Sequence, residues 1–190
     1  LRSGGTITDD GIATVRGTLT ATTDAGGSDI TLNQLAVTGA LTLAPDGAGD
    51  VIIVNAAGLN LAASTMGGTF SGTATTGNIT QTGALDIEGV TTLVTIGQGA
   101  TIDLAANGTG NAFTSQLLIT TNETNSDKDA HVSIDGGTTN LIIGTSTIDG
   151  NLTLLSGGTI TDTDSSTVTV QGTLTATTDA SASAITLNDL

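Results

Sequence analysis

Residues 17–25 of this chain read GTLTATTDA, and residues 172–180 read GTLTATTDA again. A similar offset relates residues 3–9 to residues 156–162, which both read SGGTITD. The offset drifts only from 153 to 155 residues between these landmarks. The chain therefore holds one full long repeat and the start of another, so we expect it to be a stretch of a longer array.

A weaker repeat is nested within the long one. Residues 77–81 (GNITQ) match residues 5–9 (GTITD) and residues 158–162 (GTITD). The spacing indicates a unit of roughly 70 to 85 residues, with small insertions in the turns. We therefore expect one continuous domain over residues 1–190, with internal units at approximately 1–58, 59–140 and 141–190.

Short apolar-x-apolar triplets recur along the chain, for example at residues 41–43 (LTL), 85–87 (LDI) and 152–154 (LTL). This alternation is the period-2 pattern of a strand with one buried face. Gly, Asn or Asp breaks the strands every few residues, and these residues accept the backbone conformations of tight corners. β-Branched residues dominate while the usual helix formers are scarce, so the chain is predicted to be all-β.

Two all-β architectures fit this pattern: a right-handed parallel β-solenoid and a string of immunoglobulin-like sandwiches. The strands are too short and too frequent for a sandwich. The only aromatic residues are Phe70 and Phe113, whereas sandwiches usually fill the space between their sheets with large rings. We therefore favour the solenoid, with roughly nine rungs of about 20 residues each; the tandem sandwiches are the alternative.

The charge of the chain excludes several classes of partner. Eighteen acidic residues face three basic ones, which gives a formal net charge of −15. Nucleic-acid binding needs clustered Lys and Arg, so we expect no nucleic-acid partner. There is no Cys to form disulfides or thiolate metal sites, and no apolar run is long enough to suggest membrane insertion in this segment.

Residues 121–131 (TNETNSDKDAH) interrupt the repeat and are predicted to form a loop that bulges from the side of the solenoid. Their carboxylates, Glu123, Asp127 and Asp129, could bind Ca²⁺. The spacing does not match a helix-loop-helix calcium site, so we interpret the segment as a solvated loop. The glycine-rich residues 46–50 (DGAGD) lack the Lys of a phosphate-binding loop and are predicted to be a turn.

Catalysis finds little support in the sequence. The only histidine, His131, lies in the polar segment without a supporting nucleophile motif. Some parallel β-helices cleave polysaccharides with paired carboxylates, and two acid pairs of this chain could have that role. These pairs are Asp9 with Asp10 and Asp162 with Asp164, and both flank turns. We expect no enzyme activity, no catalytic residue, no metal site and no cofactor.

Thr-x-Thr pairs, such as those at residues 6–8, 18–20 and 159–161, should point outward on either side of a buried residue. Regular stacking of such pairs would give a flat threonine grid of the kind that binds ice by ordering water. Their spacing along this chain is irregular, so we interpret them as threonines on ordinary exposed strand faces. Four Asn-x-Thr matches to the glycosylation pattern are expected to arise by chance in so Asn- and Thr-rich a chain; they begin at Asn78, Asn107, Asn122 and Asn151.

Residues 148–153 (IDGNLT), followed by residues 156–161 (SGGTIT), resemble the "GNLT…GxIT" signature of filamentous-haemagglutinin-like repeats. Residues 168–173 (VTVQGT) resemble the "LTVxGT" that follows it in those repeats. The resemblance covers essentially the whole chain. It implies a right-handed β-helix in the stalk of a giant bacterial surface protein, extracellular exposure, and a role in adhesion or cell–cell contact. It carries over no catalytic residue.

The sequence thus predicts a structural repeat segment of a large extracellular adhesin or fibre. Its expected partners are adjacent repeats of the same parent protein, a second copy bound end to end, and the surface of a host or neighbouring cell. The alternative is a surface-layer or sheath subunit that assembles laterally with calcium. A polysaccharide-cleaving enzyme is a third hypothesis.

Overall fold

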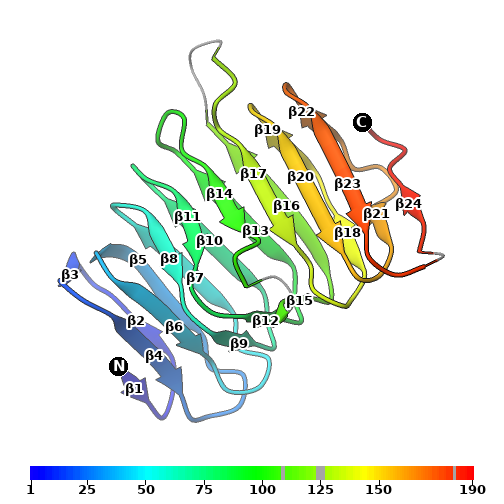
Figure 1. Cartoon of the computed structure of the whole chain (residues 1–190). Coiled ribbons are helices and arrows are strands. Elements are labelled where there is room, and N and C mark those ends of the chain that lie inside the picture. Colours follow the sequence, from blue (N-terminus) through cyan, green and yellow to red (C-terminus); the bar gives the residue numbers. More distant parts are fainter. Residues whose placement is uncertain (108–109, 123–126, 182) are drawn as a thin grey trace.

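A computed structural model of the chain describes residues 1–107, 110–122, 127–181 and 183–190. The described residues form short parallel strands and turns that stack coil upon coil into a right-handed β-solenoid of about eight turns (Figure 1). This confirms the predicted solenoid over the tandem sandwiches. The coils are somewhat fewer than the nine expected because several exceed 20 residues. The register step from Ile102 to Val132, for example, takes 30.

Three parallel sheets wall the solenoid. Sheet A runs along its whole length and contains β1 (Arg2–Ser3), β4 (Leu19–Thr23), β6 (Ala40–Ala44), β8 (Leu59–Leu61), β11 (Ile79–Gln81), β14 (Ile102–Leu104), β17 (Val132–Asp135), β20 (Leu152–Ser156) and β23 (Leu174–Thr178).

Sheet B forms the opposite wall. Its main path contains β2 (Ile7–Thr8), β5 (Ile30–Val37), β7 (Val51–Asn55), β10 (Phe70–Ala74), β13 (Thr91–Thr95), β16 (Gln116–Thr121), β18 (Leu141–Ile143), β21 (Ile160–Asp162) and β24 (Ile185–Thr186). Three further strands pair beside this path, namely β3 (Ala13–Val15), β19 (Ser146–Ile148) and β22 (Val168–Val170). Sheet C closes the middle coils with β9 (Ser64–Met66), β12 (Leu85–Ile87) and β15 (Ala112–Phe113).

The interior is filled by the apolar ends of the triplets. Residues Leu152 and Leu154, for example, are each 1% exposed, while Thr153 between them faces solvent. Both aromatic rings, Phe70 and Phe113, are also 1% exposed. The bore has little spare room: a Cβ on Gly72 would lie 2.8 Å from the tip of the Phe70 ring. Aliphatic stacking in a narrow bore therefore replaces the aromatic filling of a sandwich.

Where a straight strand stacks on a bent pair of strands, a buried serine bridges the bend. Strand β16 pairs with both β18 and β19, which are separated by a kink. There the Ser146 hydroxyl accepts a hydrogen bond from the Ile119 N–H at 3.0 Å and donates one to the Gly144 carbonyl at 3.0 Å. Both backbone groups would otherwise be unpaired inside the wall, so the hydroxyl replaces a missing ladder bond.

The same device occurs where β6 stacks on β8 and β9. The Ser64 hydroxyl accepts from the Leu43 N–H at 2.9 Å and donates to the Ala62 carbonyl at 3.0 Å. Two bends in different sheets and different coils thus use the same side chain in the same way. Each serine is the first residue of the strand that follows its kink.

A larger polar network joins sheets A and C at the middle of the solenoid. Asn111 is 3% exposed, and its side-chain oxygen accepts from the Leu85 N–H at 2.9 Å and from the Gln81 amide at 3.0 Å. Its side-chain nitrogen donates to the Leu104 carbonyl at 3.1 Å, to the Asp135 carbonyl at 2.9 Å and to the Gln81 oxygen at 3.1 Å. One amide group therefore holds together backbone from several successive coils.

The long sequence repeat keeps to the same walls. Leu19 and Leu174 both begin sheet A strands, and seven steps along that sheet separate them. Following the register strand by strand from Leu19 nevertheless leads to Ala176, two residues beyond Leu174. The copies therefore share a wall but are displaced by two residues along the strands, which keeps the inward face inward.

The nested repeat does not keep to one wall. Ile79 lies in β11 of sheet A, whereas the matching residues Ile7 and Ile160 lie in sheet B. The matching sequences share a local pattern, a turn followed by a short strand, and this pattern occurs in both sheets. The boundaries of the internal units remain a prediction.

Candidate functional surfaces

Three side chains at the entry to sheet A replace backbone bonds between coils. The side-chain oxygen of Asn78 accepts from the Thr101 N–H at 2.9 Å, and that of Asn151 accepts from the Thr173 N–H at 2.8 Å. His131 occupies the same position, and its Nδ1 accepts from the Asn151 N–H at 3.0 Å. We call Asn78, His131 and Asn151 the sheet A ladder. Its members hold successive coils together at a corner where the strands themselves have not yet begun to pair.

Sheet B has an equivalent ladder at its entry. The Asp29 carboxylate accepts from the Asp50 N–H at 2.9 Å, and the Asp50 carboxylate accepts from the Thr69 N–H at 2.7 Å. Further along, Asn140 accepts from the Thr159 N–H at 2.9 Å. The Asp and Asn side chains that precede these strands therefore accept hydrogen bonds from backbone N–H groups of the next coil. Two residues of the glycosylation-like matches, Asn78 and Asn151, have this structural role.

Replacing His131 tests the sheet A ladder. His131→Leu removes the acceptor of the Asn151 N–H and is expected to lower the free energy of unfolding by about 1 kcal/mol. The matched variant His131→Asn restores an acceptor of the kind that the ladder uses at Asn78 and Asn151, so its stability should lie within about 0.5 kcal/mol of the wild type. Urea unfolding followed by circular dichroism measures both. Equal losses for the two variants would contradict the role of the Nδ1 atom.

Two separate shallow depressions lie on the outer face of sheet A. One, of about 310 Å³, is lined by residues that include Asp103, His131, Ser133 and Thr153. The other, of about 270 Å³, is lined by residues that include Asn60 and Thr80. The strand register places one member of each coil in a single row: Asn60, Thr80, Asp103, Ser133 and Thr153.

The row offers hydroxyls, one amide and one carboxylate over several coils. His131 lies beside it, but the Nδ1 atom of this side chain already accepts a backbone hydrogen bond. Such a lining provides hydrogen bonds to water or to an extended polar partner. It does not provide the stacking surface of an aromatic ring.

One member of each acid pair considered for catalysis accepts hydrogen bonds from the backbone. Asp9 Oδ2 accepts from the Gln34 N–H at 2.8 Å, and Asp162 Oδ2 accepts from the Asp189 N–H at 2.8 Å. Gln34 and Asp189 occupy equivalent places in the two long copies, so the two carboxylates have the same task. The second members, Asp10 and Asp164, are exposed.

The calcium candidates are placed only in part. Glu123 lies outside the described residues, while Asp127 and Asp129 are exposed. In the part of the chain that the structure describes, no three His, Cys, Asp or Glu side chains are grouped so that they could hold a metal ion.

The polar segment is attached to the solenoid on both of its flanks. The Asn122 side chain donates to the Ile96 carbonyl at 2.9 Å, and the Lys128 ammonium donates to the Gln171 carbonyl at 2.7 Å. Residues 127–131 contain no strand. The predicted bulge over residues 121–131 includes residues 123–126, which lie outside the described part.

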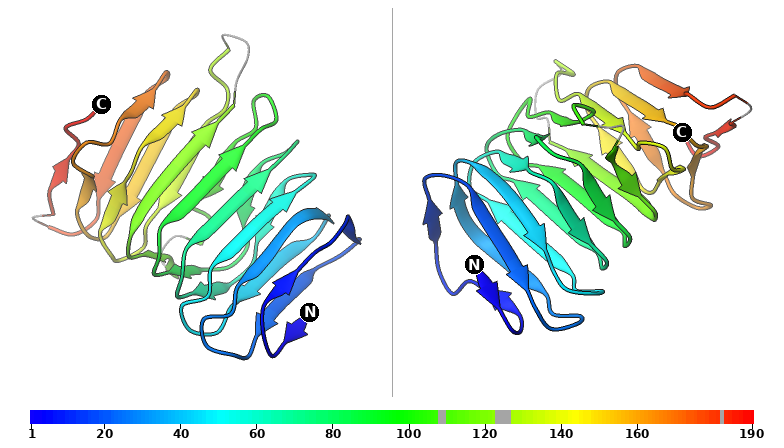
Figure 2. Two further views of the ribbon diagram at one scale, coloured as in Figure 1. Left: turned by 180° about the vertical axis from the view of Figure 1, so that it is seen from behind. Right: turned by 60° about the horizontal axis from the view of Figure 1, so that its bottom comes forward.

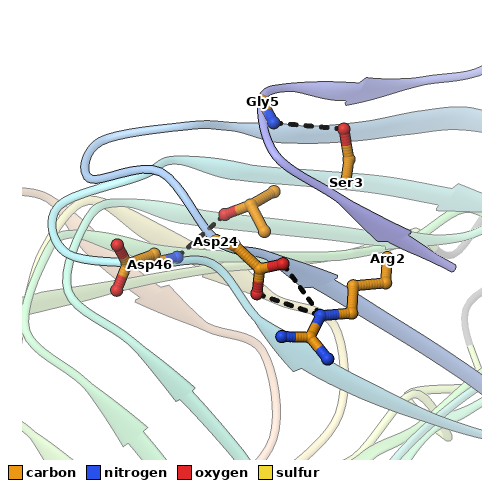
Figure 3. A network of polar contacts seen from close by, with 6 residues as sticks. Arg2, Ser3, Gly5, Asp24 and Asp46 are labelled. Atoms are coloured by element: carbon orange, nitrogen blue, oxygen red, sulfur yellow. Dashed lines mark hydrogen bonds and ion pairs between the residues drawn. The ribbon is translucent and has the colours of Figure 1, made fainter.

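The glycine-rich residues 46–50 form the predicted turn, between β6 and β7. Gly47 has a φ of 60°, in the left-handed region that favours glycine, and so does Gly27 one coil earlier, with a φ of 74°. The Asp46 N–H donates to the Thr23 hydroxyl at 2.9 Å, which stacks this turn on the preceding one (Figure 3). The segment is thus a corner of the solenoid.

The Thr-x-Thr pairs face outward as predicted: Thr18 and Thr20 are exposed on either side of the buried Leu19. They do not build a continuous threonine surface. One outward row of sheet B shows this, because apolar side chains interrupt it; it contains Thr8, Thr31, Ile52, Ser71, Thr92 and Leu118.

Comparison with protein families gives two matches to one family, described as repeats of unknown function (DUF5649), over residues 48–120 and 129–190. The chain belongs to this family. The two DUF5649 matches are interrupted at residues 121–128, within the polar segment that the sequence predicts to be an insertion. Neither the comparison with curated proteins nor that with solved structures gave a match. Among the described residues, no helix has the length and apolar character needed to cross a bilayer.

Proposed function

We propose that this chain is a structural repeat segment in the stalk of a large extracellular bacterial adhesin or fibre. It spaces a contact site away from the cell and presents a polar, acidic flank to the medium. The proposed parent is a bacterial surface protein of the filamentous-haemagglutinin-like kind, whose repeats the sequence resembles. Host or neighbouring cells are the partners of the whole fibre.

The single observation that carries the proposal is the unbroken ladder between coils. Sheet A runs from β1 to β23 without interruption, and each strand pairs with the next coil in parallel. The Asn78 and Asn151 side chains extend these bonds into the corners. In such an architecture each coil contacts its neighbours, so the fold extends along one axis and resists bending without a globular centre.

The surface chemistry supports the same function. The outward row of sheet A carries Asn, Thr, Asp and Ser, and the net charge of −15 keeps the flanks solvated. Flanks of this kind repel one another, which suits a spacer that must stay separate from parallel copies. Lateral assembly would require cations to bridge the acidic surfaces.

Antibodies raised against the purified chain test the location. They are expected to label intact cells that produce the parent protein, and brief protease treatment of intact cells should reduce the labelling. Cells without the gene are the control. Labelling that appears only after permeabilisation contradicts the proposal.

Sedimentation with and without added Ca²⁺ tests the sheath alternative. The stalk predicts the same sedimentation in both conditions. Lateral sheets that form with Ca²⁺ and dissolve on chelation would support the sheath instead.

A further inference from the structure

We propose that the outer face of sheet B is an interface on which a second copy of this chain packs, sheet against sheet. The face consists of the outward residues of β5, β7, β10, β13, β16 and β18, and we call it the sheet B face. These strands follow one another along the wall in both views of Figure 2, and each has a neighbouring strand on both sides. The inference goes beyond the stalk function and does not depend on it.

The sheet B face carries no charge, although the chain has eighteen acidic residues. All six strands lie within the described residues, and every outward side chain on them is uncharged. The face contains Thr31, Asn33, Gln34, Ala36, Ile52, Val54, Ser71, Thr73, Thr92, Val94, Gln116, Leu118, Thr120 and Ile142. Depletion of charged residues is typical of the centre of a protein interface, so the composition of this face suits a protein partner.

Apolar side chains lie on this face among the threonines. Ile52 is 42% exposed, and Val54 lies half-buried on the same strand. Val94, Leu118 and Ile142 follow on later coils and are also half-buried. The outward row of sheet A carries hydroxyls, an amide and a carboxylate instead. Of these two walls, sheet B therefore gains more from being covered, because burial of apolar surface stabilises a contact.

The acids nearest to the sheet B face lie at its rim. Asp29 and Asp50 directly precede β5 and β7, and their carboxylates accept hydrogen bonds from the Asp50 and Thr69 N–H groups. An uncharged centre inside a polar rim is the usual arrangement of an interface. A second copy can cover the centre while the rim carboxylates keep their backbone partners.

A second sheet B face matches the first in spacing. Neighbouring strands lie about 4.8 Å apart, so the side-chain rows of two such faces have the same period and can interdigitate over several coils. The strand register produces two outward rows: Ile52, Ser71, Thr92 and Leu118 in one, and Val54, Thr73, Val94 and Thr120 in the other. Two faces related by a two-fold axis cover each other, so association through them stops at a pair.

The size of the face sets the strength of the contact. Six strands about 4.8 Å apart, each with about five residues at 3.3 Å, give roughly 29 Å by 17 Å, or about 500 Å² in each copy. The pair therefore buries about 1,000 Å² in total, which is near the lower limit for specific interfaces. We expect pairing at micromolar concentrations, with a dissociation constant of about 1 to 100 μM.

The net charge restricts lateral association to this face. Each copy carries a net charge of −15, so contact between acidic corners adds to the repulsion between copies. Contact through the sheet B face places no charge at its centre and needs no bridging cation. NaCl screens the remaining repulsion and should strengthen pairing, whereas Ca²⁺ at equal ionic strength should give no further gain. A Ca²⁺-specific increase would support the cation-bridged sheath and contradict this contact.

Sedimentation velocity over a range of concentrations measures the pairing. Thr92→Asp places a carboxylate near the middle of the sheet B face and is expected to raise the dissociation constant about tenfold or more. The matched control is Thr80→Asp, at a half-buried outward threonine of sheet A, and it should change the constant by less than about twofold. Circular dichroism checks that both variants fold.

A milder pair of variants keeps the test decisive if an aspartate disturbs the fold. The chain has no Cys, so Thr92→Cys and Thr80→Cys each introduce a single thiol. A bismaleimide that spans about 10 Å, the separation of packed sheets, should link Thr92→Cys into pairs and leave Thr80→Cys largely unlinked. A monomer at all concentrations, equal effects of the two aspartates, or equal linking of the two thiols would overturn the proposal. Failure of the surface-labelling experiment would leave it intact.

Discussion

Asn111→Ala is expected to lower the free energy of unfolding by about 4 kcal/mol. The variant leaves the Leu85 N–H and the Leu104 and Asp135 carbonyls without the partner that Asn111 supplies, in a site where the side chain is 3% exposed. Each unpaired buried group costs about 1–3 kcal/mol, and the cavity adds to this. Urea unfolding followed by far-ultraviolet circular dichroism gives the loss.

Two further substitutions separate hydrogen bonding from volume. Asn111→Asp preserves the shape but places a carboxylate oxygen against the two carbonyls that the amide nitrogen serves, so it should be destabilising as well. Asn107→Ala changes an exposed turn residue of the same type nearby and should stay within about 0.5 kcal/mol of the wild type. A loss below 1 kcal/mol for Asn111→Ala would show that the network is not needed.

Gly89→Ala is the second change with a large expected effect. A Cβ at this position would overlap the carbonyl group of Gly68 and lie 2.6 Å from the Thr69 nitrogen. These atoms belong to the backbone of the preceding coil, and the Gly89 N–H bonds the same Gly68 carbonyl at 3.1 Å. No rotamer change relieves the overlap, so two coils must separate locally. The expected loss is about 3 kcal/mol.

Thermal unfolding compares this variant with Gly5→Ala. No atom lies within 4 Å of the position that a Cβ on Gly5 would take, so that substitution should have little effect. The contact at Gly89 recurs at other corners, where Gly39 stacks on Gly17 and Gly172 on Gly150. Equal melting temperatures for Gly89→Ala and Gly5→Ala would contradict the close backbone contact.

The sequence predicts the walls of this solenoid well, because inward and outward residues alternate within single strands. The triplet at residues 152–154 has its apolar ends inside and its threonine outside, as expected. Wall identity is harder to predict. Ile7 and Ile79 follow the same local pattern yet lie in different sheets, since a turn followed by an alternating strand looks the same on either wall.

Contacts between coils were the part that local patterns could not show. Asn111 stands in the glycine-rich sequence of residues 107–111 (NGTGN), which is typical of a turn, but the Asn111 side chain bonds backbone of two different coils. Asp9 suggested chemistry because another acid is beside it, yet its partners are backbone groups about 25 residues away. A signal was present: an Asn or Asp directly before an apolar triplet, as at Asn78 and Asn151, marks a residue that bridges to the next coil.

The seven steps of sheet A between Leu19 and Leu174 set a scale for how such a protein grows. At about 4.8 Å per coil, one duplication of the long unit adds about 34 Å of reach. The two-residue displacement between the copies still presents apolar residues to the bore, so unequal recombination within the gene can change the number of units without disturbing the neighbours. Length in this architecture is therefore a property that evolution can adjust in fixed increments, independently of whatever the distal tip binds.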